Sequence, residues 1–125
     1  MMKLLSLGFV IALAACGGSE ADELGVGAQC TSNDDCNPDI GPTCLTQFKG
    51  GYCGLTGCQL DADCPEDSAC VMHDDGVNYC FRICADKAQC NANRDVDNEA
   101  NCSGTADFVE GAMGRKACVP PSSGI

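Results

Sequence analysis

Apolar positions follow two different patterns along the chain. Residues 4–15 form an uncharged, mostly apolar run of 12 residues, shorter than the roughly 20 residues that a transmembrane helix needs. Between residues 30 and 118 the apolar positions show no sustained helical period and fall into short segments beside turn residues. The pattern predicts a signal-peptide core within residues 1–15, followed by a loop-rich domain.

Two β-hairpins are predicted where turn residues separate short extended segments. One hairpin joins residues 69–72 to residues 77–80 across a turn that ends in Asp75-Gly76, a pair that favours tight turns. The other joins residues 43–46 to residues 51–53 across Lys49-Gly50. Helical structure is expected only as a turn or two within residues 95–100 and 107–113.

Twelve of the 13 cysteines recur in three sets of four. The sets define units over residues 30–53, 58–80 and 84–118, and each unit begins with a C-x5-C pair. The first two units place Asp35 and Asp63 directly before their second cysteine, where the third has Gln89. Cysteine content is above the roughly 8–10 % that marks a disulfide scaffold. The expected fold class is small and disulfide-rich: loop-rich with short β-hairpins and three four-Cys repeat units.

The twelve repeated cysteines are expected to be oxidised, with bridges inside each unit, because a unit that recurs by duplication must already close its own bonds. Four cysteines allow three pairings, and we favour first with third and second with fourth. Zinc is the rival interpretation, but structural zinc sites draw on pairs spaced C-x2-C to C-x4-C, and no C-x2-C occurs here. We expect no metal and no cofactor. The disulfide cysteines are Cys30, Cys36, Cys44, Cys53, Cys58, Cys64, Cys70, Cys80, Cys84, Cys90, Cys102 and Cys118.

The amino terminus has the order of features of an export signal. Lys3 precedes the apolar run, which ends in Leu13-Ala14-Ala15-Cys16. This ending resembles the lipobox of bacterial lipoprotein precursors, which implies cleavage after residue 15 and a lipid anchor on Cys16. The alternative is an ordinary cleavage site with Cys16 in a disulfide. Giving Cys16 to lipid leaves twelve cysteines, an even number that can pair completely in an oxidising compartment.

The segments that flank the cysteine-rich units are expected to be unstructured. Residues 16–29 are rich in Gly and acidic residues and predict a lipidated amino terminus followed by a flexible tether. Residues 119–125 predict a disordered tail. Gly17 follows the anchor cysteine, and by resemblance to the sorting rule of Gram-negative lipoproteins this implies the outer membrane or cell surface.

Charge and composition exclude some functions. With 7 Lys and Arg against 18 Asp and Glu, the formal charge is −11, which excludes nucleic acid as a partner. The single histidine, His73, lies in a turn and is interpreted as solvated, and no nucleophile has a placed base. We therefore expect no catalytic residue and no enzyme. The acidic pairs Asp34-Asp35, Asp61 with Asp63, and Asp74-Asp75 offer oxygen ligands for Ca²⁺, but we favour turn formation and solubility as their role.

Two resemblances concern the cysteine spacing. The spacing from Cys58 to Cys90 resembles the amino-terminal cysteine-rich domain of Dickkopf-type secreted proteins and the units of uncharacterised Cys-rich bacterial lipoproteins. Residues 58–65 resemble the C-x-x-D-x-D-C-P opening of whey-acidic-protein inhibitor domains, without the adjacent Cys-Cys pair of that family. Both imply an extracellular, disulfide-bonded binding module.

The function expected is that of an exported, lipid-anchored surface module that binds a protein or glycan and contacts the membrane through its amino-terminal lipid. The alternative is a small secreted protein that is protease-inhibitor-like or binds Ca²⁺. The larger aromatic side chains form either a recognition face or the filling of a thin core, and we favour the core. They are Phe48, Tyr52, Tyr79, Phe81 and Phe108.

Overall fold

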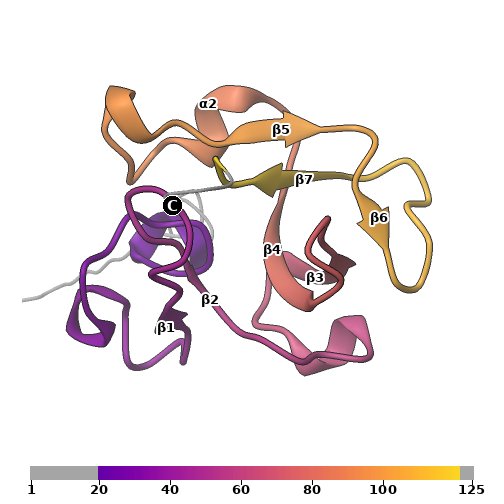
Figure 1. Ribbon diagram of the computed structural model, residues 1–125, viewed down its shortest axis with the longest axis horizontal. Helices are drawn as coiled ribbons and strands as arrows, with labels where there is room; N and C mark the ends of the chain where they lie inside the picture. The colour runs from indigo at the N-terminus through magenta and orange to yellow at the C-terminus, as the bar shows by residue number, and fades with distance from the viewer. Residues whose placement is uncertain (1–19, 122–125) are drawn as a thin grey trace, which may run out of the picture.

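The computed structural model describes residues 20–121. It is a small, loop-rich, disulfide-rich fold built of short strands, with a single α-helical turn among these residues (Figure 1). The strands are β1 (Thr43–Cys44), β2 (Cys53–Gly54), β3 (Ser68–Met72), β4 (Asn78–Cys84), β5 (Asn101–Ser103), β6 (Asp107–Phe108) and β7 (Lys116–Val119). The helical turn is α2 (Lys87–Cys90), and 3-10 turns occupy Glu20–Glu23, Asn33–Asp35, Asp61–Asp63 and Val96–Asn98.

Strand β4 holds the second and third units together. Its first residues pair with β3 in an antiparallel hairpin that places Cys70 opposite Cys80, and its last two residues pair with β7. The addition of β5 beside β7 and of β6 beside β3 gives the strand order β5-β7-β4-β3-β6 (Figure 1). The predicted hairpin is therefore confirmed, and Gly76 supplies the positive φ, +83°, that its turn requires.

The first unit has only a two-stranded sheet. Thr43 lies opposite Gly54 and Cys44 opposite Cys53, and the Leu45 amide continues the pairing by donating to the Tyr52 carbonyl at 2.9 Å. The predicted hairpin is confirmed, although its strands are shorter than expected.

The helical expectations were correct at one place and wrong at another. Val96–Asn98 forms a 3-10 turn inside the expected range 95–100. Residues 107–113 do not form a helical turn, because Asp107–Phe108 pairs with β3 as β6 and the Val109 amide donates to the Cys70 carbonyl. Helix α2 was not predicted, since four residues are too few to show a period.

The prediction of a flexible tether is wrong for residues 20–29. Ala21, Val26 and Ala28 are each only 1 % exposed. The Gly27 amide donates to the Cys53 carbonyl, and the Cys53 amide donates to the Ala28 carbonyl. Composition suggested a tether because glycine and acid dominate, but three small apolar side chains, backbone hydrogen bonds and the Asp22–Arg82 ion pair dock this segment on the domain. Residues 1–15 and the first part of the tether, including Cys16, lie outside the described residues.

The predicted tail begins too early. Val119 is the last residue of β7, opposite Asn101 of β5, so pairing with the sheet orders it. Pro120 is buried, and the Pro121 carbonyl accepts a hydrogen bond from the Lys49 amide at 3.3 Å. Residues 122–125 lie outside the described residues.

A single aromatic core joins the three units. The five aromatic side chains expected to fill the core are all buried, from 0 % exposed for Tyr52 and Phe81 to 5 % for Phe108. The Tyr52 hydroxyl donates to the Cys118 carbonyl at 2.7 Å and accepts from the Arg82 amide at 3.0 Å. Burial raises the pKa of Tyr52 well above its ordinary value. One side chain of the first unit thus satisfies a backbone group of the third unit and one of β4 where it joins the second unit to the third.

Candidate functional site

Six disulfides, two in each unit, cross-link the short strands and loops of the fold. Each unit connects its first cysteine to its third and its second to its fourth, as predicted. Within each unit three Sγ atoms lie within 4.8 Å of one another, so the two bridges of a unit are adjacent. The bridges are Cys30–Cys44, Cys36–Cys53, Cys58–Cys70, Cys64–Cys80, Cys84–Cys102 and Cys90–Cys118.

The residue directly before the second cysteine has the same task in all three units. It accepts a hydrogen bond from the backbone N–H of the residue that follows the first cysteine. Asp35 accepts from Thr31 at 2.8 Å, and Asp63 accepts from Gln59 at 3.0 Å. In the third unit the Gln89 side-chain oxygen accepts from Ala85 at 2.6 Å. The repeated position therefore closes each C-x5-C loop, and an amide oxygen replaces the carboxylate in the third unit.

These hydrogen bonds favour the ionised carboxylate. Donation from the Thr31 backbone, the Thr31 hydroxyl and the Ser32 backbone holds the pKa of Asp35 below its ordinary value. Donation from the Gln59 and Leu60 backbones does the same to the pKa of Asp63. A pKa that is lower in the folded than in the unfolded state adds stability at neutral pH, and this contribution is lost as the pH falls through the folded-state value.

The substitution Asp35→Asn is expected to lower the free energy of unfolding at pH 7 and to have less effect near pH 2. As the pH falls through the folded-state pKa the native carboxyl group becomes protonated as well, so the native protein also loses its charge-assisted bonds. Urea unfolding of the oxidised protein at both pH values measures the difference. The control is Asp34→Asn at the exposed neighbouring position. An equal loss at both pH values would show that the charge of Asp35 is unimportant.

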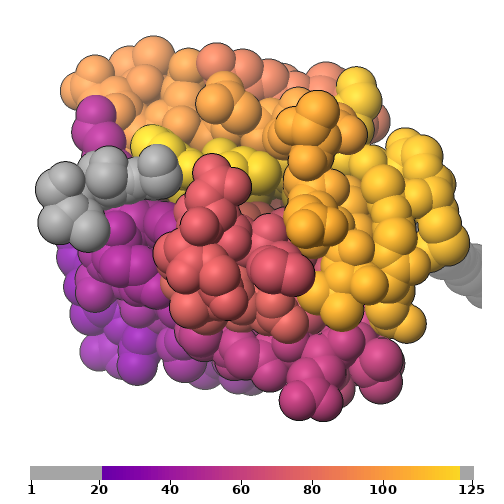
Figure 2. Space-filling model, turned by 45° about the vertical axis from the view of Figure 1, so that its right-hand side comes forward, coloured from indigo at the N-terminus to yellow at the C-terminus, as the bar shows by residue number. Residues whose placement is uncertain are grey.

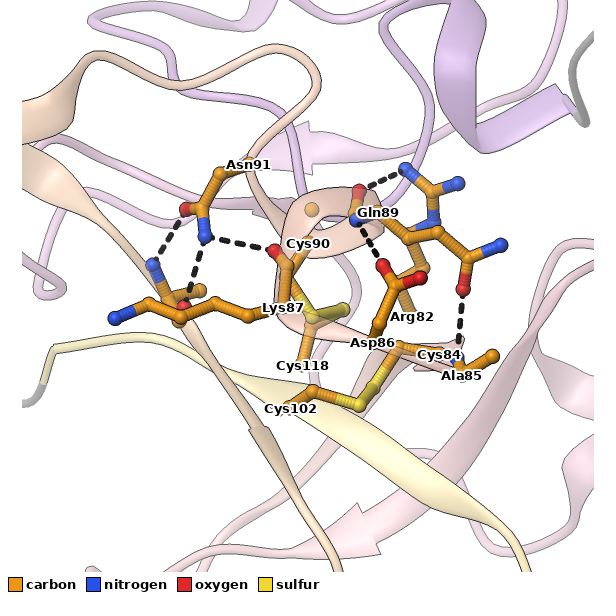
Figure 3. Close-up of a disulfide and its surroundings, with 12 residues drawn as sticks. Arg82, Cys84, Ala85, Asp86, Lys87, Gln89, Cys90, Asn91, Cys102 and Cys118 are labelled. Atoms are coloured by element: carbon orange, nitrogen blue, oxygen red, sulfur yellow. Dashed lines mark hydrogen bonds between the residues drawn. A yellow bond between two sulfur atoms is a disulfide. The ribbon is translucent and has the colours of Figure 1, made fainter.

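Helix α2 shows how the third unit keeps this arrangement with different residues (Figure 3). Asp86 caps the helix by accepting from the Gln89 amide at 3.0 Å. Asn91 follows the helix, and its side chain bonds the Lys87 carbonyl and both backbone groups of Ala100. The Arg82 guanidinium donates to the Gln89 carbonyl at 2.7 Å. Polar side chains thus order a loop that has little apolar content.

Three arginines are committed to the fold. Arg82 is 5 % exposed and pairs with Asp22 of the amino-terminal segment. Arg94 donates to the Gly51, Lys49 and Asn98 carbonyls at 2.6–2.9 Å. Arg115 pairs with Asp61 at 3.1 Å, and its guanidinium carbon lies 4.7 Å from the centre of the Phe108 ring. Sequence reasoning missed all three roles, because nothing in the spacing of these arginines signals a long-range contact.

The surface is strongly anionic as a result. All 18 acidic residues and six of the seven cationic residues lie within residues 20–121, which gives this part of the chain a formal charge of −12. Because the three arginines are engaged in the fold, the cations left at the surface are Lys49, Lys87 and Lys116. Lys87 pairs with Glu99 at 3.1 Å.

Several carboxylates of the acidic pairs have partners within the fold. Asp61 accepts from the Cys70 amide at 3.0 Å in addition to its ion pair with Arg115. Asp75 accepts from the Tyr79 hydroxyl at 2.7 Å and from the Val77 amide at 2.9 Å. Together with the loop-closing Asp35 and Asp63, these contacts agree with turn formation as the role of the pairs.

His73 is not the solvated turn residue that the sequence suggested. Its ring is half-buried and stands edge-on to three aromatic rings, with centroid distances of 5.4 Å to Phe48, 5.9 Å to Tyr79 and 5.6 Å to Phe81. The sequence placed His73 correctly in the β3–β4 turn but did not show that Phe48, from another unit, packs against it.

A cavity opens beside His73. Its volume is about 160 Å³, and it lies between the β3–β4 hairpin and the connection from β5 to β6, with Val119 of β7 among its walls. Figure 2 shows yellow residues of β7 between the salmon β3–β4 hairpin and the orange residues above. The apolar walls include Val71, Phe81 and Val119, while Asp74 and Asp107 also line the cavity. We call this site the His73 groove.

The remaining predicted site residue is Cys16, which lies outside the described residues. Among residues 20–121, none of the helices has the length and apolar character needed to cross a membrane. Fold and frame define a small disulfide-rich protein of three four-cysteine units. Comparison with family models, with curated proteins and with solved structures found no match.

Proposed function

We propose that this chain is an exported surface module without catalytic activity, anchored at the outer membrane or cell surface through acylated Cys16, that binds a protein or glycan partner. The observation that carries the proposal is the anionic surface held on a disulfide frame: a formal charge of −12 on residues 20–121, with three of their six cations engaged in the fold.

A rigid frame favours binding because less conformational entropy is lost when the partner docks. The six bridges and the side-chain hydrogen bonds of the C-x5-C loops fix the surface loops before any partner arrives. A surface of one charge steers partners of the opposite charge and raises their rate of association. The preferred partner is therefore a cationic surface, and a protein supplies one more readily than a neutral glycan does.

Export supports the same function. Disulfides persist in oxidising compartments and are rare where thiols are kept reduced. Six of them in this chain agree with the location that the signal over residues 1–15 implies. Two or more acyl chains on Cys16 anchor a protein far more firmly than one chain does.

The substitution Cys16→Ser is expected to release the protein from membranes or to block its processing, because it removes the acylated sulfur. The native mature protein is expected to have a mass above that of residues 16–125 by the added lipid. Mass spectrometry and membrane fractionation of cells that produce each form measure both effects. A Cys16→Ser protein that matures and still fractionates with membranes would show that the anchor is elsewhere.

Binding is tested on intact cells with a zero-length reagent that joins carboxylates to amines. We expect a discrete adduct with one partner, weaker as salt is raised from roughly 50 to 500 mM because screening shortens the range of charge interactions. The control is the same protein after reduction and alkylation, which should give no adduct. An adduct that resists both treatments, or none at all, would refute the proposal. A turnover that is abolished by substitution of one Asp or of His73 would show an enzyme instead.

A further inference from the structure

We propose that the His73 groove holds a lysine or arginine side chain of the partner. The inference rests on the proposed binding function and names the chemistry that one part of the surface recognises. It combines a cavity of limited volume, apolar side chains among its walls and two aspartates among its lining residues.

The volume sets the size of the occupant. Pockets for drug-sized ligands measure about 300–1,000 Å³, whereas the groove has about 160 Å³. With about 30 Å³ for each water molecule in the liquid, the groove matches roughly five waters. This is the scale of one long side chain rather than of a whole ligand.

The walls suit a hydrocarbon stem. Met72 is 44 % exposed and Val119 is half-buried, so these two offer apolar surface to a stem, whereas Val71 at 2 % and the fully buried Phe81 contribute little exposed surface. The Ser103 and Thr105 hydroxyls, which also line the groove, are hydrogen-bonded to each other at 3.1 Å. Lys and Arg side chains bury their methylene groups along apolar surface and keep their charged ends at the solvent.

The charges suit the cationic end. Asp74 and Asp107 are exposed residues of the lining, and neither lysine nor arginine lines the groove. Both carboxylates are carried on ordered backbone. Asp107 lies opposite Met72 in the β3–β6 pair. Asp74 lies in a turn that two backbone hydrogen bonds close. The His73 amide donates to the Val77 carbonyl, and the Gly76 amide donates to the His73 carbonyl. A cation at the mouth of the groove gains from charge-assisted hydrogen bonds that an alkyl group lacks.

His73 fixes one wall of the groove. Edge-on contacts with Phe48 and Phe81 hold its ring between the first unit and β4. The groove is lined by residues of the second and third units, by Phe81 between these units and by Val119 after the third. Phe48 of the first unit is not in the lining but supports the His73 ring. Pre-formed walls reduce the entropy lost when a long side chain enters.

The experiment titrates the oxidised protein with three blocked tripeptides that differ in the central residue: Gly-Lys-Gly, Gly-norleucine-Gly and Gly-Glu-Gly. Backbone amide shifts of Met72, Asp107 and Val119 report occupancy of the groove. We expect saturable shifts with the lysine peptide, weaker binding of the norleucine peptide and no binding of the glutamate peptide. Equal binding of lysine and norleucine, or lysine shifts that avoid these residues, would refute the assignment.

Two kinds of variant distinguish binding in the groove from non-specific attraction to the anionic surface. Asp74→Asn and Asp107→Asn each preserve the shape of the side chain. Each is expected to weaken the affinity for the lysine peptide by up to about fivefold, the range of an exposed ion pair. The matched control is Asp97→Asn at an exposed acid of the Val96–Asn98 turn, which should leave binding unchanged. Ala106→Leu adds bulk to the lining and should exclude the peptide. A loss for Asp97→Asn equal to that for Asp107→Asn would show non-specific attraction.

The two proposals fail separately. If the cell-surface adduct persists in the Asp74→Asn/Asp107→Asn protein while the tripeptide does not bind wild type, the binding function stands and the groove is not its site. If the tripeptide binds as expected but cells give no adduct, the groove recognises cations and the proposed anchored binding function is wrong. Retention of all six disulfides in each variant is checked by peptide mapping.

Discussion

Gly51→Ala is expected to prevent the oxidised protein from reaching its native fold. A Cβ atom at this position would lie 1.9 Å from the Cys30 carbonyl oxygen and 2.9 Å from the Cys30 Sγ. Cys30 cannot withdraw, because its amide donates to the Gly50 carbonyl and its sulfur is bonded to Cys44. Gly51 also has a φ of +72°, which L-residues with a Cβ adopt at a cost.

The matched control is Gly57→Ala. Gly57 has a similar φ of +85°, but no atom lies within 4 Å of a Cβ built there. Gly57→Ala is expected to lower the free energy of unfolding only by the cost of the left-handed backbone conformation, about 1–2 kcal/mol. The yield of monomer with six disulfides, followed by urea unfolding, compares the two proteins. If Gly51→Ala folds with the same stability as Gly57→Ala, the close approach to Cys30 is not a constraint on the fold.

Repeated local features account for what the sequence could predict. Recurrence of four cysteines in three units indicated bridges within units, and the structure has the pairing that we favoured. The Asp75-Gly76 pair indicated the β3–β4 turn, because a tight turn depends on residues adjacent in the chain. Burial of the aromatic residues followed from the thinness of any core that this chain can build.

The features that the sequence could not predict depend on long-range polar contacts. Tyr52 and Cys118 are 66 positions apart, and Arg94 reaches Gly51 across 43. No periodicity or spacing encodes such pairs, so the joining of three units into one core was not foreseen. The docking of residues 20–29 depends on the same contacts, with Asp22 held by Arg82. The His73 groove was equally hidden, since β3, the β5–β6 connection and β7 each contribute to its walls.

Removal of the Cys90–Cys118 bridge as the double variant Cys90→Ala/Cys118→Ala is expected to lower the free energy of unfolding by about 3–4 kcal/mol. It spans 28 positions, the longest separation among the six bridges, so its loss restores the most freedom to the unfolded chain. Both cysteines are at most 2 % exposed, and their truncation also leaves unfilled volume. The comparison is Cys58→Ala/Cys70→Ala, whose bridge spans 12 positions and should cost about 3 kcal/mol or less.

A second measurement, hydrogen exchange, tests whether the Cys90–Cys118 bridge does more than cross-link the unfolded chain. The Cys118 carbonyl accepts a hydrogen bond from the Tyr52 hydroxyl, and the same hydroxyl accepts a hydrogen bond from the Arg82 amide. Loosening of β7 should therefore expose the Arg82 amide to hydrogen exchange, although Arg82 lies in β4 and the two cysteines lie in α2 and β7. When the two variants are compared at equal free energy of unfolding, the Arg82 amide should be better protected in the Cys58→Ala/Cys70→Ala protein than in the Cys90→Ala/Cys118→Ala protein. Equal protection in the two variants would mean that Tyr52 does not couple the third unit to the first.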